Sequence, residues 1–306
     1  MADSNDHTHD PLASREVAAF LAAVDTGTIQ GAAEALFLTQ SAATKRIQSL
    51  ERQLGQTLLN RGRNGVTPTE AGRKLYPDAR RALAALAAAQ EAVLEQKPGG
   101  TIKLAASRTV GGYVLPGMLA EFRVDHPDLR PQVNVVNSPG VLRLVRQGEV
   151  CIGFVEGDDP LADLERLDVA DDEIVVAVAA GHRWAELGRI DSAQLPGERY
   201  VTREPGSGTR AVAEHRLAAH GVELTPEIET ASLEGVKRAL LDGGFTLISS
   251  RVVEVEVRLG NIVTLPVEDV DLNRRLVAVR PVEAPTNVAA DQLWSWLGKS
   301  NWRREP

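Results

Sequence analysis

Apolar and polar residues follow a helical period over the first third of the chain. Between Thr39 and Gly55 the apolar positions recur every three or four residues, which predicts a helix with one buried face. Two similar apolar faces precede it, over 14–26 and 29–36, and the connections between the three segments are short. Three short helices with a tight joint between the second and the third predict a helix-turn-helix.

The other side of the third helix carries short hydrogen-bonding side chains instead of the alternating acids and bases of an ordinary solvated helix. Such side chains can reach base edges in the major groove of DNA. After this helix the pattern predicts two short strands joined by a turn at 63–65, which would form a wing beside the DNA backbone. The residues that we predict to contact DNA are Thr39, Gln40, Ser41, Thr44, Lys45, Arg46, Gln48, Arg61 and Arg63.

A long helix should follow the wing, with Thr69 as its N-terminal cap. Apolar residues step along it by three and four over nearly three heptads, which is typical of a helix–helix seam. A helix that packs on its own domain's core would show a similar stripe, but the small, alanine-rich residues favour a contact between two copies. The predicted dimerisation residues are Leu75, Ala79, Ala82, Leu86, Ala89 and Val93.

Lys97-Pro98-Gly99-Gly100 should break this helix and act as a hinge. Beyond it, segments of strand character alternate with segments of helical character, which predicts parallel sheets covered by helices. The expected strands are 101–106, 132–137, 150–155, 173–180, 199–204, 245–250 and 261–267. The expected helices lie near 112–124, 139–147, 208–219, 232–241 and 287–298.

Charge separates the predicted DNA-binding region from the rest. The whole chain of 306 residues has a formal net charge of −8, so any nucleic-acid contact must be local. Between Gln40 and Arg81 there are nine basic and three acidic residues, whereas residues 1–39 hold one basic and six acidic ones. A surface that binds phosphates would concentrate positive charge in this way.

The remaining composition indicates a cytoplasmic protein without a membrane segment. The single cysteine, Cys151, rules out a disulfide within the chain, and we interpret it as a small buried apolar residue. The polar leader over residues 1–12 lacks the features of a secretory signal and should be disordered. No cysteine–histidine cluster, P-loop or G-x-G-x-x-G motif is present, so we expect no metal and no cofactor. We also expect that the protein is not an enzyme, because Gly206-Ser207-Gly208 does not match the G-x-S-x-G nucleophile elbow.

The stretch FLAAVDTGTIQGAAEALFLTQSAATKRIQSLERQLGQTLLNRGRNGVTPTEAG resembles the LysR-type transcriptional regulators. Leu50-Glu51, Leu54-Gly55, Arg61 and Thr69-Glu70-Ala71-Gly72 fall at family positions, and the resemblance extends from residue 14 to about 300. Ser41, Lys45-Arg46 and Leu59 depart from the family pattern. Weaker likeness in the C-terminal part points to the subgroup that regulates carbon-dioxide fixation and cysteine or sulfur assimilation.

This resemblance implies a winged helix-turn-helix with a long linker helix, followed by an α/β effector domain of the periplasmic-binding-protein type with two Rossmann-like lobes. It also implies a tetramer, a dimer of dimers, on an inverted repeat in double-stranded DNA, and leaves a contact with RNA polymerase open. The expected domains are a leader (1–12), a DNA-binding domain (13–68), a linker helix (69–97) and an effector domain (98–306). Lobe one would hold 101–170 and 275–306, and lobe two 171–274.

Two loops of the effector domain have the composition of an anion site. Each follows a predicted strand, opens a helix and offers an arginine with hydroxyl groups, and strand-end loops are where open α/β sheets bind ligands. The alternative is that their serines only cap helices. The predicted effector-binding residues are Ser107, Arg108, Thr109, Asn137, Ser138, Arg203, Ser207 and Thr209, with Glu156 as a weaker candidate. A solute-binding sensor, and a regulator whose cleft is filled by side chains, remain alternatives to an effector-responsive regulator.

Overall fold

The computed structural model of the chain describes residues 12–62, 65–94, 100–157, 161–282 and 287–299. The chain divides into two compact units, Met1–Val93 and Leu94–Pro306. The leader predicted over residues 1–12 and the hinge predicted at 97–100 fall almost entirely outside the described residues, as does Arg63. None of the helices among the described residues is long and apolar enough to cross a membrane.

The first unit is a helix-turn-helix followed by a hairpin and a long helix, as the pattern predicts. Its elements in chain order are α1 (Ser14–Thr26), α2 (Ile29–Ala35), α3 (Gln40–Leu54), β1 (Leu59–Gly62), β2 (Gly65–Pro68) and α4 (Glu70–Leu94). Gly27 ends α1 in the left-handed conformation, and the Thr28 hydroxyl accepts the Gly31 amide to start α2. The Gly72 amide donates to the Thr69 hydroxyl at 3.1 Å, which confirms the predicted cap of α4.

The second unit contains two helix-covered lobes. The elements of its first half are β3 (Thr101–Ala106), α5 (Arg108–Tyr113), α6 (Leu115–Asp125), β4 (Arg130–Val135), α7 (Ser138–Arg146), β5 (Ile152–Glu156) and β6 (Leu164–Ala179). Those of its second half are η1 (Ser192–Gln194), β7 (Val201–Arg203), α8 (Gly208–Ala219), β8 (Ile228–Thr230), α9 (Leu233–Leu241), β9 (Phe245–Ser249), η2 (Ser250–Val252), α10 (Glu254–Arg258), β10 (Ile262–Leu265), β11 (Asn273–Pro281) and α11 (Val288–Lys299).

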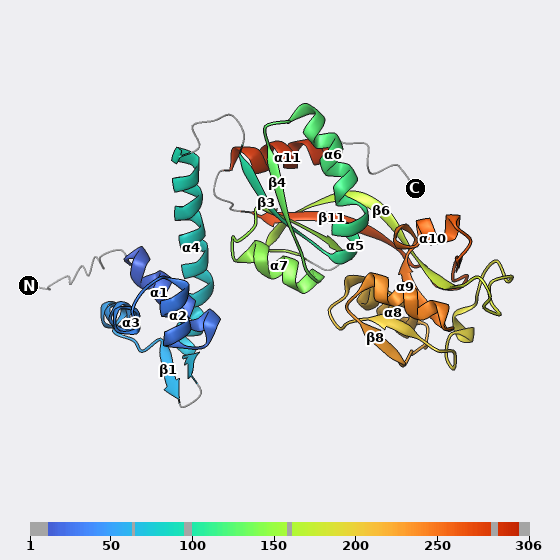
Figure 1. Cartoon of the computed structure of the whole chain (residues 1–306), viewed down its shortest axis with the longest axis horizontal. Coiled ribbons are helices and arrows are strands. Elements are labelled where there is room, and N and C mark those ends of the chain that lie inside the picture. The colour runs from blue at the N-terminus through green and yellow to red at the C-terminus, as the bar shows by residue number, and fades with distance from the viewer. Residues whose placement is uncertain (1–11, 63–64, 95–99, 158–160, 283–286, 300–306) are drawn as a thin grey trace, which may run out of the picture. The chain divides into compact units, whose positions relative to one another are not determined.

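Side-chain alternation along the strands builds a core on each face of the first lobe's sheet. Leu104 of β3 faces a cluster formed with α5, α6 and α11, whereas the adjacent Ala105 faces a cluster formed with α7. In Figure 1, α6 and α11 accordingly lie on one side of this sheet and α7 on the other. In the second lobe, α8 and α9 contribute to two separate clusters in the same way.

The sheets are mixed, which corrects the expectation of parallel sheets. Parallel pairing joins β3 to β4, β3 to β5 and β7 to β8, whereas β6 and β11 pair antiparallel with all their neighbours. The physical reason is that β6 and β11 are the two strands that pass between the lobes. One leaves the first lobe and the other returns, so they lie side by side in opposite directions (Figure 1).

A buried ion pair fastens the two passing strands at the crossing. Asp172 of β6 and Arg274 of β11 are register partners, and both side chains are fully buried. The Arg274 Nε atom donates to the Asp172 carboxylate at 2.7 Å, and the Ser249 hydroxyl donates to its other oxygen at 2.6 Å. Strands β6, β9 and β11 thus meet at one desolvated carboxylate.

Candidate DNA-binding and effector sites

Helix α3 presents the predicted polar face to solvent because its apolar face is held in the core. Ala43, Ile47 and Leu50 are completely buried in the cluster of the first unit. The predicted contact residues that are exposed are Gln40, Ser41, Lys45 and Gln48, while Thr44 and Arg46 are half-buried. The helix ends at Gly55 in the left-handed conformation. The fold therefore fixes which side of α3 can meet a partner.

Thr39, one of the predicted contacts, already has a structural role. Its hydroxyl accepts the Ala42 amide at 3.2 Å as the cap of α3 and lies 3.1 Å from the Ser41 hydroxyl. The preceding turn contains Phe37, which is 97% exposed and has a left-handed backbone with φ of 53°. The sequence pattern placed this turn but gave no signal that its aromatic side chain would be exposed beside α3.

The wing is tied to α3 by a carboxylate. The Glu51 Oε1 atom accepts the backbone amides of Leu58 and Leu59, at 2.8 and 3.2 Å. Leu59 begins β1, which pairs antiparallel with β2 and carries the exposed Arg61. One side chain of α3 thereby sets the position of the wing relative to the polar face.

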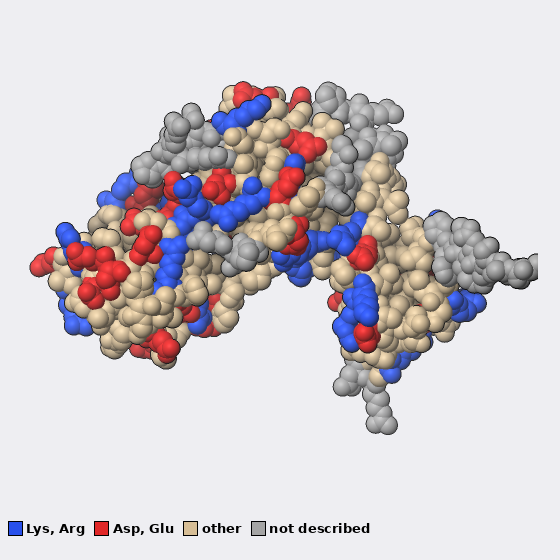
Figure 2. All heavy atoms as spheres, turned by 180° about the vertical axis from the view of Figure 1, so that it is seen from behind, with Lys and Arg blue, Asp and Glu red and all other residues tan. Residues whose placement is uncertain are grey.

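The basic residues of the first unit divide into paired and unpaired groups. On α4, Lys74 pairs with Glu70, Arg80 with Asp25 of α1, and Arg81 with Asp78. Within the described part of the chain, no ion pair involves Lys45, Arg46 or Arg61. Three of the four basic residues of the long helix are thus paired with acids, whereas Lys45, Arg46 and Arg61 on α3 and the wing have no acidic partner among the described residues. In the second unit, basic and acidic side chains are interleaved over the face that Figure 2 shows.

The seam predicted on α4 has two different environments. Leu75 and Ala79 pack in the core of the first unit, as the intramolecular alternative requires. Ala82, Leu86 and Ala89 lie further along the helix and are exposed, Leu86 by 58%. The side chain of Val93 lies outside the described residues. Dimerisation through the exposed part of the seam stays a prediction.

Of the predicted effector-binding residues, Ser107, Asn137 and Ser207 cap helices. Ser107 accepts the Val110 amide, Asn137 the Gly140 amide, and Ser207 the Arg210 amide. These caps begin α5, α7 and α8, and Ser107 and Ser207 are almost fully buried. The capping role is therefore real, and it directs the first turns of three helices towards one region.

The structure also brings the two predicted loops together across the lobes. The Thr109 and Thr209 hydroxyl oxygens are 3.4 Å apart, and both residues are buried. A Cβ atom at Gly208 would stand 2.7 Å from the Ser138 hydroxyl and 2.7 Å from a Glu156 carboxylate oxygen. The glycine lets the second lobe's loop approach the first lobe this closely. Ser138 donates to that carboxylate at 2.7 Å.

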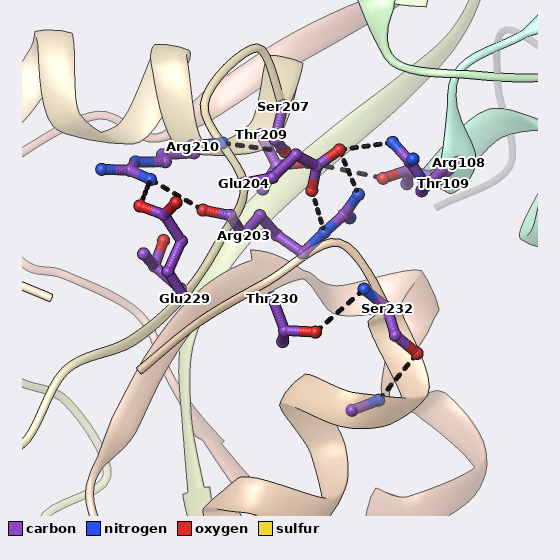
Figure 3. Close-up of polar contacts among 12 residues, drawn as sticks. Arg108, Thr109, Arg203, Glu204, Ser207, Thr209, Arg210, Glu229, Thr230 and Ser232 are labelled. Atoms are coloured by element: carbon purple, nitrogen blue, oxygen red, sulfur yellow. Dashed lines mark hydrogen bonds and ion pairs between the residues drawn. The ribbon is translucent and has the colours of Figure 1, made fainter. Parts of the chain in front are cut away.

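Two arginines, one from each lobe, converge on the same carboxylate. Arg108 follows β3 and Arg203 ends β7, and both form ion pairs with Glu204. The Arg203 Nε atom lies 3.0 Å from one Glu204 oxygen, and Arg108 pairs with the other. Figure 3 shows the carboxylate between the two guanidinium groups.

Burial is the main influence on Arg203. Its side chain is 4% exposed, which lowers its pKa, while the neighbouring Glu204 opposes that shift. The same side chain senses the positive charge of Arg108, which also lowers its pKa, and the negative charge of Glu156, which raises it. This mutual influence places two basic and two acidic groups in one electrostatic cluster. We call Arg108, Glu156, Arg203 and Glu204 the interlobe cluster.

Sequence reasoning missed two parts of this region. Glu204 stands next to Arg203, but nothing in the sequence signals that its carboxylate also meets an arginine 96 residues away. Thr230 pairs in register with Arg203. The Thr230 hydroxyl accepts the Ser232 amide, and the Ser232 hydroxyl caps α9. Thr230 ends a three-residue strand that showed no strand pattern in the sequence, and Ser232 lies in the short polar loop after it. Among the described residues, no group of three or more metal-ligating side chains is present.

Family comparisons match the two units separately. Residues 14–73 match the bacterial regulatory helix-turn-helix protein family of LysR type, and residues 95–301 match the LysR substrate binding domain. A relative named "Uncharacterized HTH-type transcriptional regulator YeiE" from Escherichia coli K12 is 34% identical over 250 residues, covering 81% of this chain and 84% of the relative.

Two further relatives fit the narrower resemblance in the effector domain. The HTH-type transcriptional regulator CysL of Bacillus subtilis is 29% identical, covering 94% of this chain and 96% of the relative. A "Probable RuBisCO transcriptional regulator" of Porphyra purpurea is 31% identical, covering 83% and 84%.

The fold is shared with a solved regulator. The crystal structure of full-length CbnR complexed with its target DNA superposes with a TM-score of 0.64 at 18% identity, covering 93% of this chain and 98% of the CbnR chain. With both family matches and these relatives, the chain belongs to the LysR family of DNA-binding transcriptional regulators and carries that family's effector-binding domain.

Proposed function

We propose that this regulator acts in the cytoplasm and reads an operator with α3 in the major groove. We also propose that a small anion, bound between the two lobes, modulates the binding to the operator. The observation that carries the DNA part is the coincidence of unpaired cations with an exposed polar helix face. Gln40, Ser41 and Gln48 can hydrogen-bond to base edges, and Lys45 can reach a guanine or a phosphate. The wing would place Arg61 at the flanking backbone.

Removing an unpaired cation should weaken operator binding more than removing a paired one. We expect Lys45→Ala and Arg61→Ala each to lower affinity about tenfold or more at physiological salt, and each lost phosphate contact to reduce the slope of log K against log salt by about 0.9. DNA fragments selected by the wild-type protein in genome-wide footprinting would serve in mobility-shift assays over a salt series. The matched control is Lys74→Ala, because Lys74 already pairs with Glu70. Equal losses for all three variants would refute the assignment.

The effector part rests on the arginines of the interlobe cluster. Arg108 and Arg203 come from different lobes and address the same carboxylate, so a bound oxyanion would contact both lobes at once. The buried hydroxyls of Thr109 and Thr209 add donors next to them. We therefore expect a small anionic metabolite rather than a resident cofactor.

One observation supports a second candidate. Because the Glu204 carboxylate already pairs with both arginines, the region has the character of a cleft filled by side chains. A regulator that binds its operator without any effector would need nothing more. The two candidates differ in whether any anion changes the footprint.

Arg203→Gln should abolish the response to an anionic effector. The substitution keeps a shorter, uncharged hydrogen-bonding side chain and removes the charge that an oxyanion needs. Footprints of the wild-type protein and the variant, with and without sulfate, phosphate and phosphorylated organic acids, would measure the response. Arg199→Gln is the control, since Arg199 pairs with Glu227 in the same lobe. A ligand-dependent footprint that survives Arg203→Gln would remove this cluster from the proposal, and the absence of any response would favour the effector-independent candidate.

Assembly into a dimer of dimers belongs to the same proposal. Ala82, Leu86 and Ala89 form an exposed small and apolar strip on α4, and a second copy of the helix would cover it. An inverted-repeat operator requires two copies of α3, which such a dimer would supply.

A further inference from the structure

The carboxylate of Glu204 occupies the place that the proposed effector's charge would take. It lies between Arg108 and Arg203, with the Arg203 Nε atom 3.0 Å and the Arg203 Nη2 atom 3.4 Å from its oxygens (Figure 3). Arginine binds carboxylate, phosphate and sulfate through the same planar donor geometry. An oxyanion entering this region would therefore use donors that Glu204 already holds.

The formal charges of the interlobe cluster cancel in this state. Arg108 and Arg203 supply two positive charges, and Glu156 and Glu204 supply two negative ones. Glu156 is 6% exposed and fixed by Ser138, so its carboxylate cannot easily leave. Glu204 is more exposed, with 17% of its side chain accessible. Of the two acids, Glu204 is the one that can give up its place.

The loop after Glu204 permits that movement. Pro205 and Gly206 are exposed, and Gly206 has a left-handed backbone with φ of 87°. Because β7 ends at Arg203, the Glu204 side chain can change to another staggered rotamer without moving the strand. By contrast, the backbone of Arg203 is held in place, because its carbonyl oxygen accepts a hydrogen bond from the Arg210 side chain at 2.8 Å.

We propose, on the basis of the anionic-effector function above, that Glu204 is a built-in competitor of the effector, and that the effector is a compact oxyanion with two negative charges. In the free regulator Glu204 links the two lobes through Arg108 and Arg203. The effector replaces this carboxylate and takes over both arginines. Glu204 therefore sets the effector concentration that is needed for binding and the charge that the effector must carry.

The charge class follows from the competition. A tethered carboxylate acts at an effective concentration on the order of millimolar, and a free ligand must also lose translational freedom on binding. A monocarboxylate would exchange one single charge for another and gain nothing. A dianion such as sulfate or phosphate offers one negative charge to each of the two arginines, whereas the Glu204 carboxylate shares a single charge between them. Only the second exchange has an electrostatic advantage.

Glu204→Gln provides the test, since it keeps the side-chain volume and removes the competing charge. Titration calorimetry on the full chain would use potassium sulfate, potassium phosphate and potassium acetate at constant ionic strength. We expect the wild-type protein to bind sulfate or phosphate more tightly than acetate, and Glu204→Gln to bind both dianions at least about tenfold more tightly than the wild type. Glu204→Ala, which also removes the carboxylate, should show the same gain if the glutamine variant folds poorly.

Two further variants locate the effect. Glu227→Gln removes the same charge from an arginine pair elsewhere in the lobe and should bind sulfate like the wild type. Combining Arg203→Gln with Glu204→Gln should abolish the gain.

The outcomes separate this proposal from the function on which it rests. One outcome is that sulfate binds equally to the wild type and to Glu204→Gln and fails to bind once Arg203 is replaced by glutamine. In that case Glu204 is no competitor, but the anion site stands. If no variant binds any of the three anions, both the competitor and the anionic effector are refuted. Acetate binding to the wild type as tightly as sulfate would overturn the dianion class.

Discussion

Asp172→Asn should destabilise the second unit by about 3–5 kcal/mol, because it leaves a buried arginine without its counter-charge. The Asp172 and Arg274 side chains are both fully buried where β6 and β11 pass between the lobes. Asparagine fits the same space and can still accept the Ser249 hydroxyl, so the loss is electrostatic. All four tryptophans lie in the second unit, so urea unfolding followed by tryptophan fluorescence reports on it. The thermal midpoint should fall by roughly 10 °C.

The adjacent residue gives a matched control. Asp171 pairs with Arg275 on the same two strands, but these side chains are 58% and 52% exposed. An exposed pair contributes about 0–1 kcal/mol, so Asp171→Asn should change the unfolding midpoint little. Similar losses for the two asparagine variants would show that the buried pair contributes no more than a surface pair.

Gly72→Ala should destabilise the first unit by about 3 kcal/mol and weaken DNA binding with it. At an exposed position within a helix, replacing glycine by alanine would stabilise the helix by about 1 kcal/mol, because alanine has the higher helix propensity. Here the added methyl group would clash with the carbonyl oxygen of Leu58 and stand 3.2 Å from its carbon. Leu58 is buried and its carbonyl accepts the Thr69 amide at 2.9 Å, so the backbone has little room to retreat.

Hydrogen exchange of peptides from residues 14–94 would measure this loss, because the first unit has no tryptophan. Gly62→Ala is the control, since the nearest atom to its added methyl would be 3.9 Å away. If Gly72→Ala exchanges as slowly as the wild-type protein, the close approach of α4 to Leu58 does not restrict this position.

The first unit could be predicted almost completely, because its signals are local. The spacing of Ala43, Ile47 and Leu50 defines the buried face of α3, and Thr39 and Gly55 mark its ends. What the sequence could not show is which cations remain unpaired. Arg80 is neutralised by Asp25, more than fifty residues away, whereas Lys45 has no such partner among the described residues.

The second unit was predicted less well where long-range pairing decides the structure. β6 starts at Leu164, about ten residues before the expected strand, because charged residues interrupt the apolar pattern of its first half. No strand was expected at β11, although the expected lobe boundary at 274–275 falls within it and its register with β6 joins the lobes. In the candidate site, Arg108 and Arg203 were identified from their loops. The role of Glu204 depends on a contact across 96 residues, and no local pattern encodes it.

The crossing strands also have an evolutionary consequence. Glu173 and Asn273 are register partners in adjacent antiparallel strands, so the segment between them leaves and re-enters the first lobe at neighbouring positions. The second lobe is therefore an insertion with both ends at one place, which is the arrangement that tolerates exchange of whole modules. A recombination event could replace residues 174–272 and leave the first lobe's hydrogen-bonded frame intact. A new sensory specificity could then be acquired in one genetic step, without redesign of the DNA-reading half.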